Sequence, residues 1–264
     1  MPAPTALLQV MIDAARKAAR AMRRDFNEVS QLQVSRKGAA DFVTAADHRA
    51  EQTLFEELLR VRPGYGFLGE ERGLVEGTDK THTWIVDPID GTTNFVHAIP
   101  HFAINIALER EGQIVAGVTY NPIADEMFWA ERGRGAFLNN EVRLRVAARR
   151  DLVDTVVATG IPFAGRPGLA RFQKELHGIA PNVAGVRRFG SAALDMAWVA
   201  AGRYDAYWER GVKRWDVAAG IVLMQEAGGM VTDADGENRI GEGGVLAANL
   251  DLHPKFLERL KAAA

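Results

Sequence analysis

The stretch Trp84-Ile85-Val86-Asp87-Pro88-Ile89-Asp90-Gly91-Thr92-Thr93-Asn94-Phe95 is the most informative part of the chain. An apolar, β-branched run ends in two carboxylates three residues apart, and a glycine, two hydroxyls and an amide follow. This pattern predicts a strand that delivers acidic oxygens to the rim of a sheet, with a helix beginning directly after it. Hard divalent cations prefer such oxygens, and the first turn of a helix can bind phosphate. The stretch therefore predicts a metal-dependent phosphatase.

The two aspartates of this stretch have a functional and a structural interpretation. Pro88 disfavours a helical conformation for Asp87, so Asp87 and Asp90 are expected across a tight bend rather than on one helix face. There each carboxylate can hold a cation or bridge two, as in two-metal sites. The structural alternative is an Asp-Pro turn followed by a helix N-cap. We favour the metal site because further acids follow apolar segments elsewhere in the chain.

Those further acids lie at two other places. Glu70 and Glu71 follow the apolar run 67–69, and Asp216 follows Trp215 at the start of a predicted helix. A pair of glutamates after a strand is typical of a solvated loop, and an acid in the first turn of a helix is favoured by the helix dipole. Both positions are also compatible with metal ligation.

Two residues are candidates for handling a water molecule. Asp47 lies three residues after Thr44, which predicts a capping box at a helix start, although Asp47 could also polarise a hydroxyl or water near the metals. The sequence leaves both interpretations open. Thr92 is the candidate for orienting an attacking water, because it directly follows the acidic bend.

Composition restricts the classes of function. The chain has 264 residues, 47% hydrophobic and 25% charged, which is typical of a globular protein with a sizeable core. A formal net charge of -2 gives no reason to expect nucleic-acid or membrane binding. Charges interrupt every apolar stretch well before a membrane-spanning length, so no transmembrane helix is expected.

The absence of cysteine excludes several mechanisms. With no thiol in the chain, disulfides, thiolate metal sites and cysteine-nucleophile phosphatase chemistry are all excluded. The N-terminal residues 1–5 lack the basic region and continuous apolar core of a signal peptide, so a cytoplasmic location is expected.

Three other patterns are given less weight. His97 and His101 have the spacing of a helical zinc pair, but Pro100 between them disfavours a shared helix face. The segment 87–92 resembles the D-x-D-x-T pattern of aspartyl-phosphate enzymes, yet its acids are three residues apart, so a covalent phosphoenzyme is the weaker mechanism. The arginine pairs 149–150 and 187–188 are expected to lie on solvated or salt-bridged faces rather than to contact nucleic acid.

Periodicity predicts the order of the elements. A first helix is N-capped by Thr5 and a second spans about 44–60. Strands at 83–86, 102–108, 114–120 and 127–130 suggest antiparallel meanders. After residue 150, strands at 153–158, 204–208 and 245–248 alternate with helices at 169–178, 191–201, 215–227 and 254–262. The predicted fold class is α/β with α+β character, with an antiparallel-rich subdomain at 1–148, an α/β subdomain at 149–264 and the active site between them.

With these residues in hand, the chain resembles the inositol monophosphatase family over essentially its full length. The resemblance is carried by the segments 41–47, 69–71, 84–97, 190–192 and 215–220. It implies a layered α/β/α/β/α sandwich, a homodimer, catalysis by two to three Mg²⁺ ions and inhibition by lithium.

The resemblance also implies roles for individual residues. Glu70, Asp87 and the Ile89 carbonyl would hold a first ion, and Asp87, Asp90 and Asp216 a second, while Glu70 would help to hold a third through waters. Asp47, Thr92 and Glu70 would be the catalytic groups. The contacts to substrate are implied for Asp90, Gly91, Thr92, Ala192, Glu209 and Asp216.

The expected reaction is hydrolysis of a phosphate monoester of a polyol, with myo-inositol 1-phosphate preferred. Histidinol phosphate, fructose 1,6-bisphosphate and phosphoadenosine phosphate are rival substrates within the family. Glu209 favours a neutral polyol, because a carboxylate repels a second phosphate. A role of another class, as a partner in transcription antitermination, is the remaining alternative. The segment after Gly160 is left without an assignment.

Overall fold

The structure is a computed structural model and describes residues 3–28, 34–38 and 41–263. Met1 and Pro2, part of the N-terminal segment considered above, lie outside the described residues. The helices are α1 (Ala6–Asn27), α2 (Ala45–Val61), α3 (Thr92–Val96), α4 (Leu169–Ile179), α5 (Ala192–Ala200), α6 (Arg214–Glu226) and α7 (His253–Ala262). No helix among the described residues has the length and apolar character needed to span a bilayer.

The larger sheet has eight strands in the order β10-β9-β8-β7-β6-β5-β3-β4. Neighbouring strands are antiparallel except β3 and β5, which run parallel. The antiparallel meander expected from the sequence is therefore confirmed. The bounds are β3 (Gly66–Gly69), β4 (Gly73–Val75), β5 (His82–Asp90), β6 (Ala103–Arg110), β7 (Gln113–Asn121), β8 (Glu126–Glu131), β9 (Gly135–Leu138) and β10 (Val142–Arg143).

The smaller sheet has five strands in the order β12-β11-β13-β15-β14. Its first three strands are parallel and the other pairings are antiparallel, so the sheet is mixed. The bounds are β11 (Val156–Thr159), β12 (Gly185–Arg187), β13 (Ala206–Arg210), β14 (Gly229–Thr232) and β15 (Gly244–Asn249). A separate hairpin pairs β1 (Val34–Gly38) with β2 (Asp41–Thr44).

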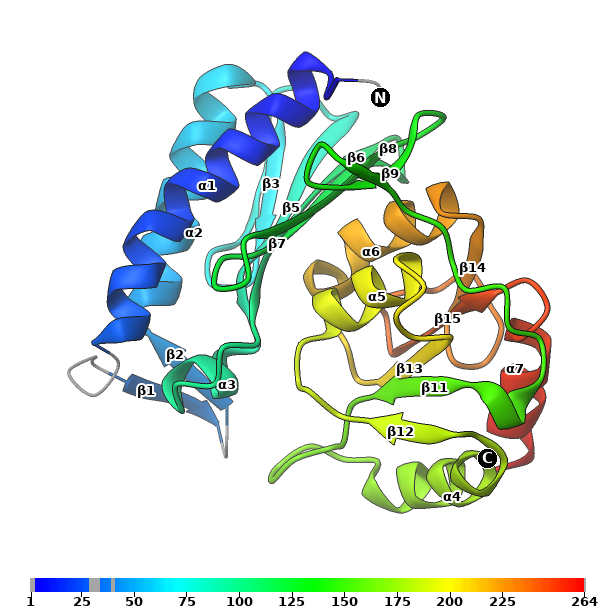
Figure 1. The fold of residues 1–264 in the computed structure, drawn as a ribbon. Helices are drawn as coiled ribbons and strands as arrows, with labels where there is room; N and C mark the ends of the chain where they lie inside the picture. The colour runs from blue at the N-terminus through cyan, green and yellow to red at the C-terminus, as the bar shows by residue number, and fades with distance from the viewer. Residues whose placement is uncertain (1–2, 29–33, 39–40, 264) are drawn as a thin grey trace.

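The two sheets and the helices form five layers (Figure 1). Helices α1 and α2 cover the outer face of the larger sheet, α5 and α6 lie between the sheets, and α4 and α7 cover the far face of the smaller sheet. Apolar clusters fill the spaces between the layers, and the cluster around α5 and α6 contacts both sheets. Because α5 and α6 contact a sheet on both sides, most of their side chains are apolar and buried. The α/β/α/β/α sandwich is thus confirmed.

Two expected strand boundaries are shifted by two or three residues. A 3₁₀ turn at Leu152–Asp154 takes the place of the expected start of the 153–158 strand, so β11 begins at Val156. The strand expected at 204–208 is β13, which extends to Arg210 and therefore includes Glu209. The helix expected at 191–201 is α5, and Ser191 is its N-cap, with its side chain accepting from the Leu194 N–H.

Candidate functional site

A bulge in β5 directs the two aspartates of the decisive stretch to one side of the sheet. Asp87 pairs with Asn105 and Asp90 with Ala103, so three steps along β5 face two steps along β6. Residues three apart in a regular strand point to opposite faces, and the extra residue of the bulge places both carboxylates on the same face. The expected tight bend is therefore a bulge within the strand.

A cleft of about 140 Å³ gathers most of the residues predicted to be functional. Its lining includes Glu70, Asp87, Ile89, Asp90, Gly91, Thr92, Ala192, Glu209 and Asp216. These residues come from the ends of β3, β5 and β13 and from the starts of α3, α5 and α6. Asp47 does not line the cleft and is completely buried behind it, at the start of α2.

Protein donors hold one oxygen of each aspartate at the cleft. The Ile89 N–H donates to Asp87 Oδ1 at 2.9 Å, and the Lys213 N–H donates to Asp216 Oδ2 at 2.7 Å. Asp90 Oδ2 accepts from the Ser191 hydroxyl at 2.5 Å and from the Ala193 N–H at 2.8 Å. Each of the three carboxylates is thus held in place by hydrogen bonds to one of its two oxygens.

The acids of the cleft raise one another's pKa. Burial raises the pKa of Asp87 well above its ordinary value, and the nearby carboxylates of Glu70, Asp90 and Asp216 raise it further. Burial raises the pKa of Asp90 to about 7, despite the hydrogen bonds from Ser191 and Ala193. The pKa of Asp216 is raised by burial and then by Asp90. A positive charge in the cleft would lower these pKa values and allow all three acids to ionise at neutral pH.

The donor set fits a hard divalent cation. It consists of carboxylate and carbonyl oxygens, the ligands that Mg²⁺ prefers. Among the residues that the structure describes, no three acidic or histidine side chains are already drawn together as a finished metal site.

The hydroxyl of Thr92 links the cleft to the buried Asp47. Thr92 Oγ1 lies 3.3 Å from Asp47 Oδ1 and 3.0 Å from the Ile89 carbonyl oxygen, and its single proton can be donated to only one of them at a time. Asp47 Oδ2 accepts from the Thr44 N–H at 2.8 Å. The capping box and the contact to Thr92 thus coexist, one on each oxygen of Asp47. Burial raises the pKa of Asp47 to about 6.

The first turn of α3 faces the cleft beside these acids. Gly91 is its N-cap with φ 100°, a left-handed conformation that glycine adopts without strain. The first N–H groups of a helix have no partner within the helix, so those of Gly91 and Thr92, followed by that of Thr93, can face an anion. Asn94 fixes this turn by donating to the carbonyl oxygens of His101 and Phe189, each at 2.7 Å.

The other end of the cleft is organised around Glu209. Its Oε2 accepts from the Tyr207 hydroxyl at 2.7 Å, and its carboxyl group lies against Gly160, where an added Cβ would come within 1.9 Å of it. Burial raises the pKa of Glu209, while the positive charges of Arg188 and Arg166 lower it. Both arginines line the cleft.

These arginines were not predicted to be at the site. The sequence placed the pair 187–188 on a solvated or salt-bridged face, and Arg188 is exposed but lines the cleft. Arg166 lies in the segment left without an assignment, and its guanidinium covers the Phe163 ring at 4.3 Å. The other pair behaves as expected, because Arg149 and Arg150 form ion pairs with Asp205 and Asp251.

The residues that hold the acids in place were also not predicted from the sequence. Asn105 is fully buried and donates to the carbonyl oxygens of Trp215 at 2.7 Å and Asp216 at 3.1 Å, while its own side-chain oxygen accepts from Thr119. This side chain ties the start of α6 to the larger sheet. The available signal was a polar residue among apolar neighbours, Asn105 in β6 and Thr119 in β7. Such residues need hydrogen-bond partners when they are buried.

Glu51 supports the turn that carries Glu70. It is buried in α2, and its Oε2 accepts from the Glu71 N–H at 2.8 Å. Gly69 makes room for this contact, because a Cβ there would lie 2.3 Å from Glu51 Oε2. The 69–71 motif thus includes a glycine that is needed for packing.

Replacing Gly69 by Ala is therefore expected to displace Glu51 and destabilise the protein by about 1–3 kcal/mol, the usual cost of overpacking. Thermal unfolding measures the effect, and Gly243→Ala is the matched control, because nothing lies within 4 Å of a Cβ there and Gly243, like Gly69, does not have a positive φ. A Gly69→Ala protein as stable as the parent would contradict this account of the contact.

Comparisons with known proteins identify relatives of this chain. The model of the "Inositol monophosphatase family" matches residues 4–264. The "Inositol-1-monophosphatase" of Caulobacter vibrioides is 68% identical over 96% of this chain and 100% of its own length. The "Nus factor SuhB" of Escherichia coli K12 is 41% identical over 92% and 91% of the two chains.

A solved structure shows the same fold. The extragenic suppressor protein suhB from Bartonella henselae has a TM-score of 0.94 and 52% identity, covering 97% of this chain and 99% of its own. From the match over residues 4–264 and the likeness to these relatives, and in line with the segments quoted from its sequence, the chain belongs to the inositol monophosphatase family.

Proposed function

We propose that this protein is a Mg²⁺-dependent phosphomonoesterase that hydrolyses myo-inositol 1-phosphate to inositol and phosphate. The observation that carries the proposal is the single cleft in which four acids, the first turn of α3 and Glu209 meet. The name of the Caulobacter vibrioides relative supports the choice of substrate. The lining of the cleft comes from both sides of residue 148, in line with a division into 1–148 and 149–264.

The proposed metal ligands follow the family resemblance. Glu70, Asp87 and the Ile89 carbonyl would hold one ion, and Asp87, Asp90 and Asp216 a second, with Glu70 helping to hold a third through waters. The family is generally metal-dependent, and the all-oxygen donor set favours Mg²⁺. When bound, the ions lower the pKa of water, neutralise the phosphate and stabilise the leaving alkoxide.

The chain's own groups orient the reactants. The Thr92 hydroxyl, when it donates to Asp47, can accept a hydrogen bond from the attacking water through a lone pair. This hydrogen bond positions the water for attack without a covalent phosphoenzyme. The N–H groups of Gly91 and Thr92 would bind phosphate oxygens at the start of α3.

The proposed contacts to the alcohol part of the substrate lie at the opposite end. Glu209 would accept hydrogen bonds from two hydroxyls, and the Ala192 N–H would donate to another. Asp90 and Asp216 would face the ester oxygen together with the ions they hold. Because the carboxylate of Glu209 is held by Tyr207 and Gly160, its position is set before substrate arrives.

Arg166 and Arg188 favour a second candidate substrate class. Positive charge at the polyol end could accept a second phosphate, as in fructose 1,6-bisphosphate or phosphoadenosine phosphate. Glu209 opposes this choice by charge repulsion. The two substrate classes are distinguished by measuring kcat/KM for four compounds: fructose 1,6-bisphosphate, phosphoadenosine phosphate, histidinol phosphate and myo-inositol 1-phosphate.

We expect the highest kcat/KM for myo-inositol 1-phosphate. Arg188→Gln is then expected to change that value by less than about threefold, since a neutral polyol does not need the charge. A bisphosphate that is hydrolysed best, and that loses at least about tenfold in kcat/KM with Arg188→Gln, would replace inositol phosphate as the proposed substrate.

The resemblance also supports a homodimer, a cytoplasmic location and inhibition by lithium as parts of the proposal. The relatives named Nus factor SuhB suggest a role in transcription as a candidate of another class. Co-purification of transcription factors with the Asp90→Asn protein would support such a role, because it would not depend on turnover. Sedimentation of the purified protein tests the homodimer.

A further inference from the structure

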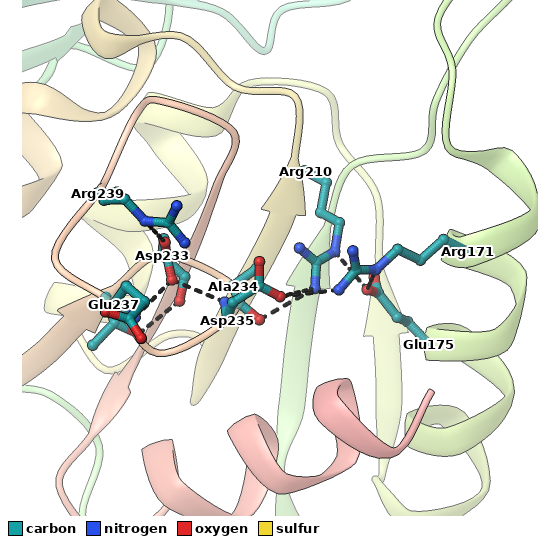
Figure 2. Close-up of polar contacts among 9 residues, drawn as sticks. Arg171, Glu175, Arg210, Asp233, Ala234, Asp235, Glu237 and Arg239 are labelled. Atoms are coloured by element: carbon teal, nitrogen blue, oxygen red, sulfur yellow. Dashed lines mark hydrogen bonds and ion pairs between the residues drawn. The ribbon is translucent and has the colours of Figure 1, made fainter. Parts of the chain in front are cut away.

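Four charged side chains form an ion-pair cluster around Arg210, the residue that follows Glu209 in the chain (Figure 2). The cluster consists of Arg171, Glu175, Arg210 and Asp235. Arg210 Nε donates to Glu175 Oε1 at 2.5 Å and Arg210 Nη2 to Asp235 Oδ1 at 3.0 Å. Arg171 bonds to the same two oxygens, at 3.2 Å and 2.9 Å. Each arginine thus bridges both acids, which fixes the geometry more tightly than a single ion pair.

The cluster joins three separate elements. Arg171 and Glu175 lie on α4, Arg210 ends β13, and Asp235 lies in the turn after β14. The Glu175 side chain is 1% exposed and that of Arg210 is 20% exposed. Arg210 Nη2 also donates to the Ala234 carbonyl oxygen at 3.2 Å, so the guanidinium is bound to the turn as well as to the helix. Glu175 is the buried member of the cluster, and its two arginine partners offset the cost of burying its charge.

The end of β13 needs such support. On one side β13 pairs with β15 as far as Arg210, opposite Gly244. On the other side its pairing with β11 ends at Trp208, opposite Thr159. Glu209 and Arg210 are therefore hydrogen-bonded to a neighbouring strand on one side only. Since adjacent residues in a strand point to opposite faces, Glu209 faces the cleft while Arg210 enters the cluster.

The helix of the cluster is connected to the same end of the cleft. The segment 160–168, which precedes α4, contributes Gly160, Ile161, Phe163 and Arg166 to the cleft lining. Gly160 contacts the Glu209 carboxyl group directly. The cluster therefore ties together α4, which follows this segment, and β13, which carries Glu209.

We propose that Arg210, through its ion pairs with Glu175 and Asp235, is a positioning residue that holds Glu209 and the 160–168 segment in register for recognition of the substrate's hydroxyl groups. This inference rests on the proposed function, in which Glu209 accepts hydrogen bonds from those hydroxyls. Arg210 itself does not line the cleft. Its effect is expected in substrate selectivity rather than in the cleavage of the phosphate ester.

The test compares two substrates, myo-inositol 1-phosphate and phenyl phosphate, which has no hydroxyl groups for Glu209. With Arg210→Gln, kcat/KM for the inositol ester is expected to fall about tenfold, mainly through KM, and that for phenyl phosphate to stay within about twofold. An equal loss for both substrates, or no loss for either, would overturn the proposal. Arg239→Gln is the matched control, because Arg239 pairs with Asp233 in the same turn and its side chain is 61% exposed.

A double variant tests whether Arg210 acts through Glu209. If it does, Arg210→Gln combined with Glu209→Gln loses no more than about twofold beyond Glu209→Gln alone. Independent, fully additive losses would overturn the proposal. Should Arg210→Gln fail to fold in a thermal scan, Arg210→Lys replaces it, since lysine keeps the charge but lacks the fork that reaches both acids.

The Glu209→Gln protein separates this inference from the proposed function. A Glu209→Gln protein with unchanged selectivity between the two substrates overturns the proposed role of Glu209, and the role of Arg210 with it. Changed selectivity with Glu209→Gln but not with Arg210→Gln or Arg210→Lys overturns only the positioning role. The inference is supported if Glu209→Gln and Arg210→Gln each change the selectivity between the two substrates and their effects on kcat/KM are not additive in the double variant.

Discussion

Replacing Asp90 by Asn is expected to lower kcat by about 10³-fold or more at saturating Mg²⁺. Asparagine has almost the same shape as aspartate but no negative charge. Its amide oxygen can still accept the hydrogen bonds that the Ser191 hydroxyl and the Ala193 N–H donate to Asp90. The charge lost is one of those proposed to hold the ions. Phosphate release from myo-inositol 1-phosphate measures the effect.

Asp251→Asn serves as the control for this substitution. Asp251 is 54% exposed in its side chain and pairs with Arg150 away from the cleft, so turnover is expected to stay within about twofold. An Asp90→Asn protein that retains turnover within a few-fold of the parent would show that the site is assigned to the wrong residues.

The metal-free protein is expected to lose stability as the pH rises from about 4 to about 7. The pKa of Asp90 is about 7 in the folded protein against an ordinary value of 3.8, and burial and the neighbouring acids raise those of Asp87 and Asp216 as well. The folded state therefore keeps protons that the unfolded state has released in this range, so each step up in pH favours unfolding.

Asp90→Asn removes one of these titrating groups. In EDTA, its Tm is expected to match that of the parent near pH 4 and to exceed it by about 5 °C or more at pH 7.5. Added Mg²⁺ is expected to raise the Tm of the parent more at pH 7.5 than at pH 5, since the ionised acids bind it. Parallel Tm curves for parent and variant across this pH range would contradict the raised pKa of Asp90.

The sequence predicted those parts of the site whose signals are local. Asp87, Asp90 and Asp216 each stand at the end of an apolar run or at the start of a helix, which indicates the element that carries each side chain. The capping box at Thr44 was one of the two interpretations left open for Asp47, and the structure contains it. The fold class was accessible from the switch between strand-rich and alternating segments.

Features that depend on distant parts of the chain were not predicted. The bulge between Asp87 and Asp90 exists only in the register with β6, and the role of Asn105 depends on α6, more than a hundred residues away. Arg166 lies in a segment without periodicity, so no pattern indicated that it lines the cleft. The shift of β13 by two residues arises because its pairing with β15 extends to Arg210.

The bulge in β5 offers access to a group that side-chain substitution cannot reach. The Ile89 side chain is 1% exposed and packs in the core, while its carbonyl oxygen lies within reach of the Thr92 hydroxyl. Shortening the segment by deleting Ile89 would leave aspartates two positions apart, and a regular pleat still points such residues the same way. A one-residue deletion would thus keep both acids on one face and withdraw the carbonyl oxygen together with the Ile89 N–H that donates to Asp87 and a side chain of the core. Backbone length is therefore the variable by which the share of this whole residue in cation affinity can be weighed.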